Sequence, residues 1–153
     1  MKKLFILLCI AVFFCIGIHA SGSQTVLLVY EKTRFKTGLI EEMKTILENQ
    51  GFAVATFEHS KKNMDKIDPS GYSVIFITNS GVNSKVRPWI TDWISSSSPE
   101  TKGKILLHTT QRDDWKVQTD VDAVTSASER KNTRQFAEEY TQRIMDIASV
   151  KDE

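Results

Sequence analysis

The sequence predicts an α/β domain in which an open parallel sheet is doubly wound, with helices on both faces. Three apolar runs, Thr25–Tyr30, Ser73–Thr78 and Lys104–His108, read as strands that are buried on both faces. Segments with apolar residues at helical spacing separate these runs. Because parallel strands need crossover connections, which are usually helical, this alternation indicates a parallel sheet rather than a sandwich or a helical bundle.

The first half of the domain follows this alternation closely. After the strand Thr25–Tyr30, Thr37 is the predicted N-cap of a helix whose apolar positions run from Leu39 to Leu47. Gly51 is typical of the residue that follows a helix, and Phe52–Phe57 reads as the second strand. The polar segment His59–Tyr72 has room for a short helix at most and carries a turn signal, Asp-Pro-Ser-Gly.

The second half repeats the pattern with a weaker last strand. After the third strand, Val86–Ile94 is amphipathic, and its Pro88 is compatible only with the first turn of a helix. The fourth strand is Lys104–His108, the fifth is Asp120–Thr125, and a closing helix is predicted over Thr133–Ala148. No internal repeat interrupts this order, so one domain is predicted.

The N-terminus has the pattern of a signal peptide. Lys2 and Lys3 precede the uncharged apolar run Leu4–Ile18, and Ala20 ends the segment before polar residues. We expect residues 1–20 to be removed and the protein to be exported, to the periplasm or outside the cell. A retained anchor is the alternative, but an apolar run of about 15 residues is shorter than the roughly 20 that span a bilayer. The domain would then be residues 21–150, with a frayed tail at 151–153.

Cleavage changes the chemistry of the chain. Cys9 and Cys15 both lie in the leader, so the mature domain is expected to have no disulfide and no thiol nucleophile. Loss of Lys2 and Lys3 changes the formal net charge from +1 to −1. This balance excludes nucleic acid as the expected partner, and the histidine spacing gives no metal site.

In a doubly wound sheet, ligands bind beyond the carboxyl ends of the strands, at the point where the strand order reverses. Three segments are expected to meet there: Glu31–Thr37, Asn79–Lys85 and Thr109–Val117. His108 is expected to be the last residue of the fourth strand, where it would either act as an acid or base or form a hydrogen bond to the backbone.

The segments resemble a flavodoxin-like domain in their order and spacing, over nearly the whole chain after Ala20. Val26–Tyr30 with a loop ending at Thr37 is similar to the first strand and phosphate loop of that family. Asp68–Tyr72 and Lys102–Leu107 resemble the entries to its third and fourth strands. The resemblance implies five strands in the order 2-1-3-4-5, FMN at the switch point, and electron transfer with a redox partner.

The phosphate loop departs from the family pattern. Lys32 and Arg34 stand where the family has hydroxyl residues, Phe35 stands where it has glycine, and only Thr37 matches. Either Lys32, Arg34 and Lys36 bind a phosphate through charge-assisted bonds, or the loop has lost the ligand and is a solvated basic rim. The FMN-binding residues that the resemblance implies are Lys32, Thr33, Arg34, Lys36, Thr37, Asn79, Ser80, Gly81, Thr109, Thr110 and Trp115.

Two features of the sequence concern flavin binding: a tryptophan that could stack on the ring and a serine that could carry the cofactor. Trp115 is the expected wall for the flavin ring, whereas Trp89 and Trp93 have helical spacing and are predicted to lie in the core. Asp122–Ser128 resembles the sequence through which extracytoplasmic flavoproteins attach FMN covalently, with Ser128 as the acceptor. The alternative is that Ser128 caps the closing helix.

Two functions therefore stay open. One is an exported flavodoxin-like protein that binds FMN and transfers electrons. The other is a cofactor-free flavodoxin-like module that recognises a protein partner or a small ligand through the same loops, because a fold does not determine a function.

Overall fold

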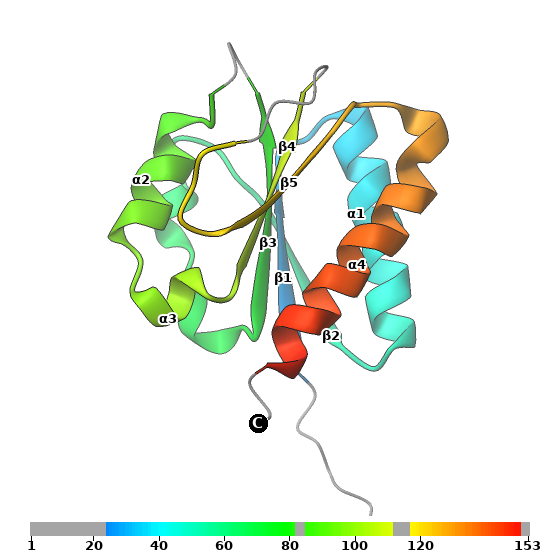
Figure 1. Ribbon diagram of the computed structural model, residues 1–153, viewed down its shortest axis with the longest axis horizontal. Helices are drawn as coiled ribbons and strands as arrows, with labels where there is room; N and C mark the ends of the chain where they lie inside the picture. The colour runs from blue at the N-terminus through cyan, green and yellow to red at the C-terminus, as the bar shows by residue number, and fades with distance from the viewer. Residues whose placement is uncertain (1–23, 82–84, 112–116, 151–153) are drawn as a thin grey trace, which may run out of the picture.

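A parallel five-stranded sheet forms the centre of the molecule (Figure 1), in the order β2-β1-β3-β4-β5. This computed structural model describes residues 24–81, 85–111 and 117–150. The strands are β1 (Thr25–Tyr30), β2 (Ala53–Glu58), β3 (Val74–Ser80), β4 (Ile105–Thr110) and β5 (Asp122–Ser126). The predicted fold class and strand order are confirmed.

Helices cover both faces of the sheet (Figure 1). The α-helices are α1 (Arg34–Asn49), α2 (Pro88–Ser96), α3 (Pro99–Lys102) and α4 (Thr133–Ser149), and the short 3₁₀ helices are η1 (Met64–Lys66), η2 (Pro69–Gly71) and η3 (Arg130–Asn132). Helices α1 and α4 pack side by side on one face, and α2 lies on the other. The order of the strands reverses between β1 and β3, so this pair forms the switch point.

Alternation along the strands divides the core into two layers. Val26, Leu28 and Phe76 face α1 and α4, whereas the neighbouring residues Leu27 and Ile75 face α2. All five side chains are buried. The continuous apolar runs in the sequence arise because each central strand contributes to both layers.

The structure corrects the start of the first helix. Helix α1 begins at Arg34, and Thr33 is its N-cap, with its hydroxyl accepting a hydrogen bond from the Lys36 amide at 3.2 Å. The predicted N-cap, Thr37, lies inside the helix, and its own amide donates to the Thr33 carbonyl at 2.8 Å. The connection between β1 and α1 is therefore short, consisting of residues 31–33.

The closing helix begins at Thr133, as predicted, but Ser128 does not cap it. Asn132 occupies the N-cap position, and a 3₁₀ turn separates it from Ser128. In the connection between β4 and β5, residues 117–121 form no helix. Among the described helices none is both long and apolar enough to span a bilayer.

Candidate functional site

A cluster of charged side chains occupies the switch point, at the carboxyl ends of β1 and β3. Glu31 follows β1, Ser80 ends β3, and Lys36 projects from the first turn of α1. The Lys36 ammonium lies 2.6 Å from Glu31 Oε2 and donates to Ser80 Oγ at 2.8 Å. The Ser80 hydroxyl in turn donates to Glu31 Oε2 at 2.5 Å. We call these residues, together with Arg87, the switch-point cluster.

Arg87 reaches the same carboxylate from the segment before α2. Its Nε lies 3.5 Å from Glu31 Oε1, and its guanidinium carbon lies 5.5 Å from the centroid of the Trp89 ring. The Arg87 amide donates to Asn79 Oδ1 at 3.0 Å, which fixes the backbone of this segment against β3. One carboxylate therefore accepts hydrogen bonds from Lys36 and Ser80 and also lies within ion-pair distance of Arg87.

Burial and charge act in opposite directions on the ion pair. Burial raises the pKa of the Glu31 carboxyl. The hydrogen bonds from Lys36 and Ser80 and the positive charge of Lys36 lower it by more, so the pKa lies below its ordinary value of 4.5. Burial lowers the pKa of Lys36, and the Glu31 carboxylate only partly opposes this effect. Glu31 is thus ionised at neutral pH, beside a lysine side chain that is only 1% exposed.

A histidine and a tryptophan adjoin the switch-point cluster. His59, directly after β2, is 4% exposed, and its Nε2 lies 2.8 Å from the Thr78 carbonyl. The Trp89 indole N–H donates to His59 Nδ1 at 3.4 Å, so the neutral tautomer with its proton on Nε2 satisfies both contacts. Burial lowers the pKa of His59, and this tautomer is the one present at neutral pH.

Several predicted site residues hold strands together instead of facing an open site. Asn79 Nδ2 donates to Thr109 Oγ1 at 3.4 Å, and Thr110 Oγ1 donates to the Asn79 carbonyl at 3.2 Å; all three side chains are buried. The Gly81 amide continues the β3–β4 ladder by donating to the Thr110 carbonyl at 3.1 Å. A Cβ atom at Gly81 would lie 3.1 Å from the Thr110 carbonyl oxygen, a tight contact with backbone, and the Gln111 side chain would have to move aside for it.

The predicted phosphate loop separates into exposed and buried parts. Lys32, Thr33 and Arg34 are exposed at the N-terminus of α1, whereas Lys36 is buried in the switch-point cluster. Phe35 is also buried, and its ring meets that of Phe136 edge-on at 6.3 Å. The structure therefore brings together Lys36 and Ser80 but leaves Lys32 and Arg34 on the rim.

Two other predicted residues bear on flavin binding. Trp115 lies outside the described residues. Ser128 is described and exposed, just beyond the carboxyl end of β5. Asp122, at the other end of β5, pairs with Arg143 through both carboxylate oxygens, at 2.8 and 2.9 Å.

His108 differs from its sequence interpretation. It lies within β4 rather than at its end, and its ring stacks on Phe76 with the centroids 5.9 Å apart. Its Nε2 lies 2.9 Å from Ser126 Oγ, so its hydrogen-bond partner is a side chain and not the backbone. The ring is fully buried, which makes His108 a core residue with no access to a substrate.

The sequence analysis placed the segment Glu31–Thr37 at the switch point but gave Glu31 no role, and it did not assign His59, Arg87 or Trp89 to the site. A usable signal was present for Glu31 and His59, because each comes directly after a strand that pairs within the sheet. Polar residues at that position meet at the carboxyl edge of a parallel sheet. Trp89 is packed against the α2 layer, as predicted, but its indole N–H also reaches the site.

This architecture is similar to that of several solved structures. A flavo di-iron protein mutant from Thermotoga maritima matches with a TM-score of 0.55 and 12% identity, over 81% of this chain and 35% of that chain. A flavodoxin from the domain Archaea matches with a TM-score of 0.52 and 9% identity, over 82% and 99%. The chain has a flavodoxin-like fold. No protein-family model and no curated protein matches it.

A third match agrees with the flavodoxin-like assignment. Flavodoxin 2 from Bacillus cereus aligns with a TM-score of 0.50 and 10% identity, over 78% of this chain and 99% of that chain. The chain thus spans nearly all of each flavodoxin but only about a third of the flavo di-iron protein. At these identities the likeness concerns the fold, and the site has to be judged from its own residues.

The described residues do not fit an FMN phosphate held by a loop at the start of α1. The connection is short, and its cap, Thr33, already binds the Lys36 amide. The ionised Glu31 carboxylate lies at the switch point and would repel a phosphate there. Where the family has a glycine, Phe35 is part of a helix and of the core.

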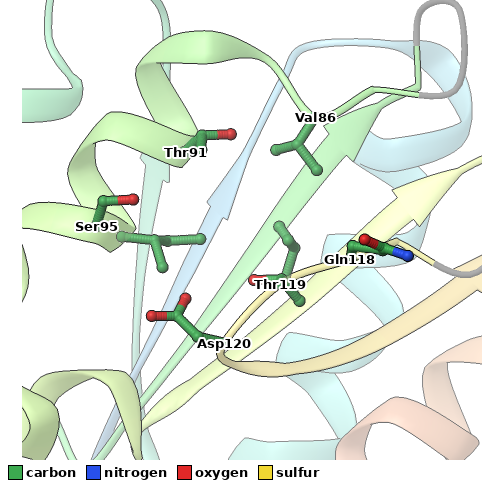
Figure 2. A pocket seen from close by; sticks show the side chains of 8 residues that line it. Val86, Thr91, Ser95, Gln118, Thr119 and Asp120 are labelled. Carbon is green, nitrogen blue, oxygen red and sulfur yellow. The ribbon is translucent and has the colours of Figure 1, made fainter.

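A separate hollow of about 210 Å³ lies beside α2 (Figure 2). Thr91 and Ser95 project into it from the helix, and Thr119 and Asp120 face them from the β4–β5 connection. Its remaining lining residues are Val86, Ile94, Leu107 and Gln118. Asp120 is engaged by Lys102 at 2.5 Å, so the hollow presents hydroxyl groups but no spare charge. Its residues are distinct from the switch-point cluster.

Proposed function

We propose that this protein acts after export as a flavodoxin-like binding module, which recognises an acidic protein partner at the carboxyl edge of its sheet without FMN. The observation that supports this proposal best is the position of Glu31. Its carboxylate binds Lys36 and Ser80 and lies close to Arg87, at the switch point where doubly wound sheets usually bind their ligands. The carboxyl edge therefore presents exposed cationic side chains, while the donors of the switch-point cluster are bound to Glu31.

Six exposed basic residues surround that centre, and we call them the basic rim. They follow the carboxyl ends of four strands: Lys32, Arg34, Lys61, Lys62, Lys85 and Arg130. None of the six forms an ion pair with another residue that the structure describes. A spread of unpaired positive charge suits a broad acidic surface better than a single small anion.

The opposite edge of the sheet is organised differently. There Lys102 pairs with Asp120 and Lys104 pairs with Glu100, at 2.5 and 3.0 Å. Arg143 pairs with Asp122 near the start of β5. Since these three basic residues are neutralised within the chain and the basic rim has no ion pair among the described residues, we expect the carboxyl edge to be the one that attracts an acidic partner.

Electron transfer with FMN is the second candidate function. It is favoured by the likeness to flavodoxins and by the exposed Lys32, Thr33 and Arg34 at the N-terminus of α1. The test is to titrate the exported protein into FMN and to follow flavin fluorescence. We expect no saturable quenching at micromolar FMN, and quenching that saturates there would overturn the proposal.

Covalent flavin is examined with the same preparation. Yellow colour that remains in acid-precipitated protein, and that is lost in the Ser128→Ala variant, would establish attachment at that exposed hydroxyl. Colourless protein is the expected result. Sequencing of the N-terminus of the exported protein checks the predicted cleavage after Ala20, and an uncleaved chain would contradict that part of the proposal.

Partner recognition is tested with poly-L-glutamate as a probe of an acidic polypeptide. The Lys32→Gln/Arg34→Gln variant is expected to bind it about threefold to tenfold more weakly than the wild-type protein. The control is Lys44→Gln/Lys102→Gln, which loses the same charge from residues that already form ion pairs. Equal weakening in the two variants, or tighter binding of duplex DNA than of polyglutamate, would contradict the proposal.

A further inference from the structure

Three donors converge on a single carboxylate at the switch point. Glu31 Oε2 receives the Lys36 ammonium at 2.6 Å and the Ser80 hydroxyl at 2.5 Å, and Arg87 Nε lies 3.5 Å from Oε1. An ammonium, a hydroxyl and a guanidinium are the groups by which proteins bind carboxylates and phosphates. In this chain their ligand is one of its own side chains.

The backbone of each donor residue is held in place by contacts other than those to Glu31. The first turn of α1, capped by Thr33, positions Lys36, and the β3–β4 ladder positions Ser80. The amide of Arg87 is bound by Asn79, and its guanidinium lies over Trp89. The donor set is therefore preorganised, which lowers the cost of binding an anion.

One donor in the cluster has spare capacity. Arg87 Nε is buried and makes no hydrogen bond to any residue that the structure describes. A buried N–H without an acceptor is unfavourable. An external oxyanion that accepts a hydrogen bond from Arg87 Nε, as the Glu31 side chain does not, would remove this cost. Glu31 itself is 17% exposed and belongs to a connection, so its side chain can turn toward solvent without disturbing a strand.

We infer that Lys36, Ser80 and Arg87 form an oxyanion-binding site, which Glu31 occupies from within and from which a carboxylate or phosphate can displace it. The site consists of side chains from α1, β3 and the segment before α2, and it does not use the shortened loop at the start of α1. This inference rests on the cluster geometry and does not depend on the partner proposed for the basic rim.

The charge of Lys36 makes the site testable. With Glu31 removed, the buried ammonium has no counter-ion, which is strongly destabilising. An external oxyanion that enters the vacated position binds the folded state only, so it raises the melting temperature as its concentration rises. In the wild-type protein the same anion has to displace Glu31 first, and its effect is smaller.

The experiment is thermal unfolding of the Glu31→Ala variant in sodium phosphate, sodium acetate or sodium chloride at equal ionic strength. We expect phosphate, acetate or both to raise Tm above the chloride value by about 3 °C or more at 100 mM. The phosphate and acetate arms distinguish the two kinds of ligand. The Glu58→Ala variant is the control, because it removes an exposed carboxylate from the end of the neighbouring strand β2.

A double variant separates a bound anion from a general salt effect. Glu31→Ala/Lys36→Met lacks the buried ammonium and should lose the anion-dependent rise in Tm. If Glu31→Ala does not fold, Glu31→Gln removes the charge but still fills the position, so it should show an anion-dependent rise in Tm that is larger than that of the wild-type protein, because a neutral amide is displaced more easily than a carboxylate. An anion response no larger than that of Glu58→Ala, or one that persists in the double variant, would overturn the inference. Polyglutamate binding through Lys32 and Arg34 would be unaffected by that failure.

Discussion

Two buried polar clusters differ in position and in charge: one lies at the carboxyl edge of the sheet, and the other lies between the sheet and α4. The switch-point cluster joins an ionised glutamate to a lysine at the carboxyl edge. The second cluster, formed by His108, Ser126 and Tyr140, is neutral and lies deeper, where burial lowers the pKa of His108 to about 3 and raises the pKa of Tyr140 to about 12. Of these two clusters, the charged one is thus the one at the carboxyl ends of the strands.

The difference has a physical cause. An ion pair in a dry interior costs more desolvation energy than its attraction returns, whereas a neutral hydrogen bond does not carry that cost. His108 can therefore pack against both Phe76 and Tyr140, with centroid distances of 5.9 and 5.0 Å. We expect the neutral cluster to define the packing of β4 and β5 against α4, and the charged cluster to respond to ligands.

The largest expected effect on stability tests the difference in burial between Lys36 and Glu31 in the switch-point cluster. Glu31→Ala should lower the free energy of unfolding by about 3–5 kcal/mol, because Lys36 cannot reach water. Lys36→Met should cost less, roughly 1–2 kcal/mol, since the partly exposed Glu31 can turn toward solvent. Urea unfolding at pH 7 measures both values. Equal losses would show that the two charges are equally buried.

The next effect concerns acid and the neutral cluster. The pKa of His108 is about 3 in the folded protein, against 6.5 in the unfolded chain, so the unfolded state binds a proton first as pH falls. This difference should remove about 2 kcal/mol of stability between pH 7.5 and pH 5. The loss begins near pH 6.5 and continues toward pH 3.

The control for this pH dependence is a variant of the same residue. His108→Gln is expected to be less stable than the wild-type protein at pH 7.5 but to show a flatter dependence on pH. Part of the slope should remain, because burial also lowers the pKa of His59. An unchanged slope in the His108 variant would show that the pKa of His108 is the same in the folded and the unfolded protein.

A smaller effect distinguishes the two threonines at the start of α1. Thr33→Ala should cost about 1 kcal/mol, because the hydroxyl that binds the Lys36 amide is lost. Thr37→Ala should have little effect, because Thr37 lies inside the helix, where alanine is favoured. Chemical denaturation of the two variants compares them, and the opposite order would restore Thr37 as the cap.

The smallest effect separates the basic rim from both clusters. Lys32→Gln should leave the free energy of unfolding within about 0.5 kcal/mol of the wild-type value, since this side chain is exposed and unpaired among the described residues. Weakened binding of polyglutamate with unchanged stability is the expected combination. A clear loss of stability would show that Lys32 has a structural contact.

The predicted strands and helices were mostly correct because their signals are local. The runs around Val26–Val29 and Val74–Ile77 are apolar at every position, and only strands buried on both faces need such a pattern. The site was harder to predict. Lys36 was expected on an exposed loop, and its burial depends on Glu31 and on Ser80, which is 44 residues away.

The sequence by itself determined the parallel α/β architecture, because apolar periodicity decides which residues must leave water. It also determined that Lys32, Arg34 and Phe35 stand where the phosphate loop of flavodoxins has two hydroxyl residues and a glycine, although the likeness to flavodoxins is one of fold. Only the tertiary structure decided what replaces them. The start of α1 at Arg34, capped by Thr33, directs Lys36 inward, and the register of β1 with β3 brings Glu31 and Ser80 to the same ammonium. Such a cluster depends on side chains from distant segments, and their meeting is fixed by packing and not by any local pattern.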